Sequence, residues 1–141
     1  MGAETVPAFG LLGRTDLPGV AGSVCSARRF VRGVLENSGW RDTYDAELLV
    51  SELVSNAVRH SKSGRAGGRV TVAVANRGDT IRIAVIDEGS STCAPRLPAE
   101  PDEDAEGGRG LWLVREVALS WGWHEGTAGR GRVVWFQLAW R

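Results

Sequence analysis

Glu52 and Asn56 lie four positions apart in a segment whose apolar residues recur with helical spacing. At that separation two side chains lie one turn apart on the same face of a helix. Mg²⁺ prefers oxygen ligands in near-octahedral geometry and keeps several of its waters. Asn56 is therefore a candidate metal ligand, and Glu52 is a candidate general base for a water or hydroxyl proton. The same pair also fits the solvated polar side of an amphipathic helix.

Asp87 directly follows an apolar run that predicts a strand, and Glu88 and Gly89 come next. A carboxylate at the end of a buried strand can accept the exocyclic amine proton of adenine. It rejects guanine, which presents an oxygen acceptor at that position. Gly89 has no side chain, so the backbone there could approach a base closely. An ordinary turn from strand to loop, in which Asp and Gly are common, explains the same residues.

A glycine-rich turn precedes a third segment with helical spacing, which begins at Leu111. The turn consists of Gly107, Gly108, Arg109 and Gly110. Glycines permit positive φ, and exposed N–H groups at a helix N-terminus bind anions. A flexible hinge into the helix is the alternative. The segment matches neither the dinucleotide fingerprint, which needs a further glycine, nor the P-loop, which needs lysine before serine or threonine.

The apolar periodicity predicts the elements that must position these residues. Helices are expected over 21–37, from Asp42 or Thr43 as the cap to about residue 60, and from 111 onward. Strands are expected around 5–13, over 70–74, 81–87, 121–125 and 133–140, with turns at 16–19, 76–79 and 126–131. This order predicts an α+β two-layer sandwich, in which about three helices cover one face of a mixed, mostly antiparallel sheet.

The chain has 141 residues, the size of one ordinary domain. We expect residues 1–17 to form a tail or edge strand and 18–141 to form a single domain. Residues 90–107 contain three prolines and a run of acidic residues without any period, which predicts a loop able to act as a lid.

Composition excludes several classes of function. Lys plus Arg and Asp plus Glu are 17 each, and this balance argues against a nucleic-acid binder. No segment approaches the roughly 20 apolar residues of a spanning helix, and no signal peptide is recognisable, so we expect no membrane association. The two cysteines, Cys25 and Cys93, are far apart and fit a reducing, cytoplasmic environment.

Taken in order, three segments resemble the N box and the two glycine boxes of one ATPase superfamily, that of gyrase, heat-shock chaperone, histidine kinase and MutL. They are Glu-Leu-Val-Ser-Asn-Ala-Val-Arg-His at 52–60, Asp-Glu-Gly at 87–89 and Gly-Gly-Arg-Gly-Leu at 107–111. The short format is similar to the anti-sigma factor serine/threonine kinase branch, and the resemblance covers nearly everything after residue 18. It implies the Bergerat ATP-binding fold, with ATP under the 90–107 lid.

The resemblance also implies roles for individual residues. Asn56 would ligate Mg²⁺, and Asp87 would bind adenine. Glu52 matches the position of the family's proposed general base. The remaining ATP-binding positions implied are Gly89, Gly107, Gly108, Arg109, Gly110 and Leu111. Members of the branch phosphorylate a serine on an anti-anti-sigma partner and sequester a sigma factor, usually as homodimers.

Two positions depart from the family pattern. Ser91 stands where the first glycine box usually has a second glycine, and Val133 stands where a threonine is common in the final strand. Both departures bear on catalysis, so a catalytically inactive ATP-dependent protein-binding module is the alternative to a kinase. A detached histidine-kinase catalytic domain ranks last, because no helix pair with a phospho-acceptor histidine precedes the ATP site.

Overall fold

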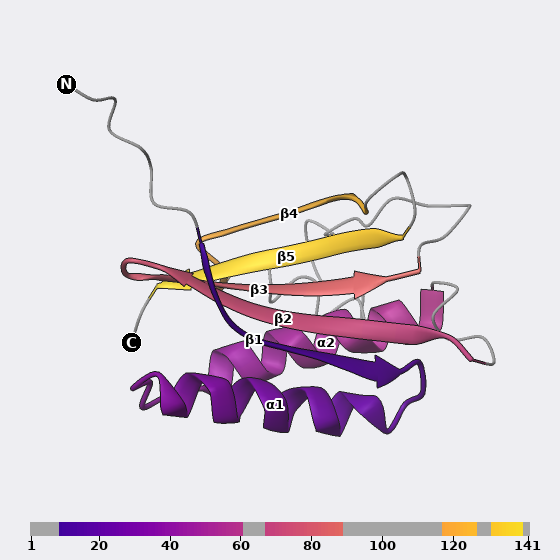
Figure 1. Cartoon of the computed structure of the whole chain (residues 1–141), viewed down its shortest axis with the longest axis horizontal. Helices are drawn as coiled ribbons and strands as arrows, with labels where there is room; N and C mark the ends of the chain where they lie inside the picture. Colours follow the sequence, from indigo (N-terminus) through magenta and orange to yellow (C-terminus); the bar gives the residue numbers. More distant parts are fainter. Residues whose placement is uncertain (1–8, 61–66, 89–116, 127–130, 140–141) are drawn as a thin grey trace.

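The computed structural model of the chain describes residues 9–60, 67–88, 117–126 and 131–139. In chain order they form β1 (Gly10–Pro18), α1 (Ser23–Asn37), α2 (Tyr44–His60), β2 (Arg69–Arg77), β3 (Thr80–Asp87), β4 (Ser120–Glu125) and β5 (Arg132–Ala139). The two helices lie side by side on one face of the sheet, which confirms the α+β sandwich (Figure 1).

The sheet has the strand order β1-β2-β3-β5-β4, and all four neighbouring pairs are antiparallel. Both predicted hairpins are confirmed, since β2 pairs with β3 and β4 pairs with β5. The first hairpin turns through Gly78 and Asp79, and Gly78 has φ of +56°. Two-residue turns between antiparallel strands require positive φ, which glycine adopts without strain.

The core lies between the sheet and the helices. Alternate residues of the central strands point toward the helices, as their period of two requires. The fully buried strand residues are Val70, Val72, Val74, Ile81, Ile83, Val85 and Phe136. The helices meet them with Ala27, Val31 and Leu35 of α1 and with Ala46, Leu49, Val50, Leu53, Val54 and Ala57 of α2. The apolar periodicity that predicts both helices therefore corresponds to their buried faces.

The first strand departs from the prediction. β1 spans Gly10–Pro18 rather than residues 5–13, and the turn predicted at 16–19 is wrong because its first three residues pair with β2. Leu17 pairs with Val70 and packs against the core, so its burial outweighs the local turn signal of Pro18 and Gly19. Proline is tolerated there because β1 is an edge strand.

The third expected helix lies mostly outside the described residues, as do the 90–107 lid, Gly89, the turn at 107–110 and Leu111. Val117 and Ala118, at the end of that helix segment, are half-buried and pack against the core. Neither α1 nor α2, the two helices described in full, is long and apolar enough to cross a membrane.

Candidate functional site

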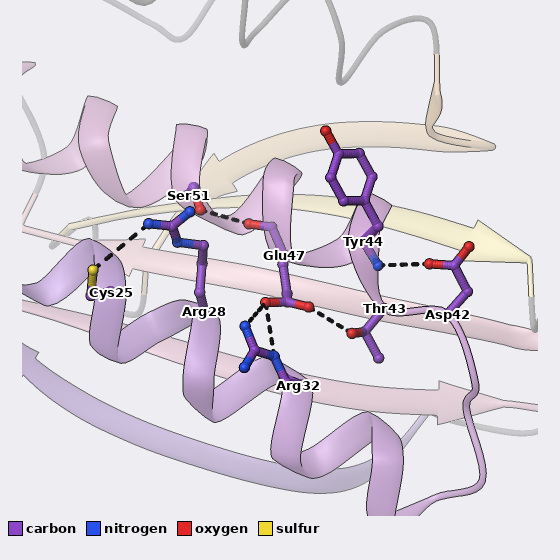
Figure 2. Close-up of polar contacts among 8 residues, drawn as sticks. All are labelled: Cys25, Arg28, Arg32, Asp42, Thr43, Tyr44, Glu47 and Ser51. Carbon is purple, nitrogen blue, oxygen red and sulfur yellow. Dashed lines mark hydrogen bonds and ion pairs between the residues drawn. The ribbon is translucent and has the colours of Figure 1, made fainter.

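α2 carries polar side chains on both sides of its buried stripe. Glu47 faces α1, because its carboxylate accepts hydrogen bonds from the Arg32 guanidinium at 2.6 and 3.1 Å (Figure 2). An α-helix turns by roughly 100° per residue, so Glu52 lies roughly 140° around the axis from Glu47. Glu52 and Asn56 therefore occupy the flank of α2 that is turned away from α1.

That flank faces the β5 side of the sheet. Asp45 precedes Glu52 by seven residues, so the two lie on the same flank. Asp45 lines a small cavity together with Leu138 and Ala139, at the C-terminal end of β5. α1 contacts β1 and β2 instead, on the opposite side of α2. The Glu52–Asn56 flank consequently borders the part of the helix layer that α1 does not occupy.

The Asp87 side chain points to this same, helix-covered side of the sheet. It continues the alternation of Ile81, Ile83 and Val85, which point toward the helices, and only 5% of its surface is exposed. The N-terminal end of α2 lies against the C-terminal end of β5, and β5 runs antiparallel to β3. The C-terminal half of α2 therefore runs toward the end of the sheet that carries Asp87, as Figure 1 shows.

Arg132 faces Asp87 directly across the β3–β5 ladder, and its Nη2 lies 3.4 Å from Asp87 Oδ2. The two side chains are 11% and 2% exposed. A buried carboxylate is costly unless it is paired, and this arginine meets that requirement. Sequence reasoning missed Arg132. Its only local signal is its position directly after Gly131, at the start of a strand whose register is not visible in the sequence.

The carboxyl group of Glu52 is half-buried in α2. Loss of water around it raises the pKa of Glu52 above its ordinary value, and the positive charge of Arg59 offsets part of this rise. A carboxyl with a raised pKa is a better proton acceptor once ionised, and such groups are common at catalytic sites. The environment of Glu52 thus suits the role of base.

Asn56 is half-buried one turn beyond Glu52. Within the part of the chain that the structure describes, no group of three or more His, Cys, Asp or Glu residues could hold a metal ion. The amide oxygen of Asn56 is the kind of ligand that Mg²⁺ accepts alongside phosphate oxygens and water.

Val133, one of the two departures from the family pattern, does not face the candidate site. Val133 pairs with Ile86, and both lie on the face of the sheet away from the helices and from Asp87. A threonine there would not place its hydroxyl beside the Asp87 carboxylate. The residue opposite Asp87 is Arg132. Ser91, the other departure, lies outside the described residues together with Gly89, Gly107, Gly108, Arg109, Gly110 and Leu111.

A family model described as the histidine kinase-like ATPase domain matches residues 18–138. The chain belongs to this family. The resemblance seen in the three sequence boxes is thereby confirmed, and the two-layer fold agrees with it.

The relatives of this chain include proteins named serine-protein kinase RsbW. The protein of Listeria monocytogenes serotype 4a (strain HCC23) is 32% identical over 120 residues, which cover 79% of this chain and 69% of the relative. The protein of Staphylococcus aureus (strain JH9) is 32% identical over 113 residues, covering 72% of this chain and 71% of the relative. Within the histidine kinase-like ATPase family, this chain is thus similar to proteins named as serine-protein kinases.

Proposed function

We propose that this chain binds ATP with Mg²⁺ and phosphorylates a serine on an anti-anti-sigma-type protein, as part of a switch that also holds a sigma factor. One observation supports the site above all. The buried Asp87 carboxylate lies at the end of the sheet toward which the Glu52–Asn56 flank of α2 runs. Similarity to proteins named serine-protein kinases supports the reaction class.

Each residue has a distinct proposed role. Asp87 accepts a hydrogen bond from the adenine amine, and Asn56 holds the metal ion through its amide oxygen. Glu52 takes the proton that the serine hydroxyl loses, for which its raised pKa suits it. Gly107, Gly108 and Gly110 bind phosphates through their N–H groups. When bound, Mg–ATP supplies the phosphoryl group and the charge neutralisation on which such transfer mostly depends.

Nucleotide titration with and without Mg²⁺ tests the binding site. We expect Asp87→Asn to weaken ATP binding at least about tenfold, because the substituted amide loses the charged acceptor. Asn56→Ala should remove the magnesium dependence of affinity. Asp79→Asn, at the exposed turn at the other end of the same strand, is the matched control and should bind as wild type. Wild-type affinity in Asp87→Asn would contradict the adenine assignment.

Incubation with radiolabelled ATP and candidate partner domains tests the reaction. Label on a partner serine supports the kinase. Tight ATP binding without any transfer to the cognate partner contradicts it and leaves the ATP-dependent binding module as the function. Acid-labile label on a histidine would instead identify the histidine-kinase class.

A further inference from the structure

We propose that Arg132 reads the base together with Asp87, by donating a hydrogen bond to N1 of adenine. The proposal rests on the proposed ATP site and assigns to Arg132 a part in base recognition that the three sequence boxes do not contain. It makes Arg132 a specificity-determining residue of the nucleotide site.

The backbone fixes Arg132 beside Asp87. The two residues face each other in the β3–β5 ladder, which places their Cβ atoms about 4.5–5.5 Å apart on the same face. Gly131, directly before Arg132, has φ of +73°, and a Cβ atom there would clash with the Asp87 carbonyl oxygen. The two backbones are thus in close contact at this end, so the position of Arg132 relative to Asp87 is set by the sheet.

The chemistry of the pair matches one edge of adenine. The Asp87 carboxylate is an acceptor with about four lone-pair sites, so one ion pair does not prevent it from accepting a further hydrogen bond. The Arg132 guanidinium carries five N–H donors in a rigid plane, and it makes the 3.4 Å contact with Asp87 through Nη2. An acceptor beside a donor complements the amine at C6 and the neighbouring N1 acceptor of adenine.

Burial makes this recognition effective. Both side chains are almost withdrawn from water, at 2% and 11% exposed, so water competes little with the base for them. Arg82 offers a contrast within the same sheet. It lies on the face of the sheet opposite to Asp87, and its Cζ is 4.3 Å from the ring centroids of both Phe9 and Trp135. A substitution of Arg82 removes an arginine without touching the Asp87 side of the sheet.

The test measures the affinities of ATP and of 1-deaza-ATP, in which a C–H group replaces N1. For the wild-type protein we expect 1-deaza-ATP to bind roughly tenfold or more weakly than ATP, because a charged donor loses its acceptor. In Arg132→Met this ratio should fall to near one, and Arg132→Lys should restore part of it. Arg82→Met should keep the wild-type ratio.

The outcomes separate this inference from the proposed function. If ATP binds but the wild type does not distinguish 1-deaza-ATP from it, Arg132 does not contact N1. An unchanged ratio in Arg132→Met leads to the same conclusion, since a purely structural ion pair would weaken both nucleotides equally. If Arg132→Met fails to fold, the wild-type ratio and that of Arg132→Lys still decide. Failure of the wild type to bind ATP at all would overturn the proposed function itself.

Discussion

Two glutamates of α2 lie five residues apart and occupy opposite environments. The Glu47 carboxylate accepts hydrogen bonds from Arg32 and from the Thr43 hydroxyl, which lies 2.6 Å away (Figure 2). The Arg32 hydrogen bond is the main cause that lowers the pKa of Glu47, and Thr43 adds to it. Burial instead raises the pKa of Glu52. The helix thus carries one carboxylate held by partners and one destabilised by loss of water.

The contrast separates a structural acid from a candidate catalytic one. Glu47 joins α1 to the first turn of α2, and this contact orients the helix whose other flank carries Glu52. An acid stabilised in its charged form by fixed partners is a weak proton acceptor, whereas a desolvated one gains by taking a proton. The pKa directions therefore assign different roles to two residues that look alike in the sequence.

The sharpest test of this contrast is phosphoryl transfer. We expect Glu52→Gln to lower the transfer rate by roughly 10²–10⁴-fold, the usual contribution of a positioned general base, with ATP affinity nearly unchanged. Glu47→Gln, the matched control on the other flank, should keep most of the rate. Single-turnover transfer to the cognate partner measures both. Full activity in Glu52→Gln would show that some other group, or none, accepts the proton.

The free energy of unfolding should depend more on Glu47 than on Glu52, the reverse of the expected effects on phosphoryl transfer. Glu47→Gln replaces a charged acceptor and should lower the free energy of unfolding by about 1 kcal/mol, a value kept small because Arg32 is half-exposed. Glu52→Gln should leave stability unchanged or raise it at neutral pH, since it removes a desolvated charge. Urea unfolding of the two variants measures the difference. A larger loss in Glu52→Gln would reverse the assignment of structural and catalytic acid.

The pH dependence of stability should separate the two acids further. The pKa of Glu47 is lower in the folded state, so its contribution is present above the ordinary glutamate pKa and is lost as pH falls through the folded value. The pKa of Glu52 is higher in the folded state, so its contribution is present at low pH and is lost as pH rises through that raised value.

Unfolding curves between about pH 3 and pH 7 test these signs. Glu47→Gln should have a lower free energy of unfolding than wild type, and this difference should shrink as the pH falls. Any gain in the free energy of unfolding of Glu52→Gln over wild type should instead grow as the pH rises. Parallel curves for wild type and both variants would mean that neither carboxyl changes its pKa on folding.

Local pattern was sufficient for much of this fold, because burial imposes a period on each element. The apolar arcs of α1 and α2 and the alternation in β2 and β3 were visible in the sequence for that reason. β1 was misplaced because its pairing with Arg69–Thr71, some fifty residues away, decides its end. Pairing over such distances leaves no mark in the local composition of either segment.

The residues of the candidate site divide in the same way, into three that local sequence reveals and one that only long-range strand pairing places. Glu52, Asn56 and Asp87 were selected from their types, spacing and place within elements. Arg132 was missed, because only the β3–β5 register places it opposite Asp87. Side-chain direction in a strand reverses with each residue, so a shift of one position between Arg132 and Val133 changes which of them faces the site.

The smallest expected effect concerns the second partner of Glu47. Thr43→Val removes the hydroxyl that donates to Glu47 Oε2 but leaves the Arg32 hydrogen bonds in place. We expect a loss of about 0.5–1 kcal/mol in the free energy of unfolding. The pKa of Glu47 should rise toward its ordinary value without reaching it, because Arg32 is the larger cause of the shift. Thr43→Ser keeps the hydroxyl and is the control. If an NMR titration found the same Glu47 pKa in Thr43→Val and in wild type, the Thr43 hydroxyl would make no contribution to the lowered pKa of Glu47 and would take no part in the contrast with Glu52.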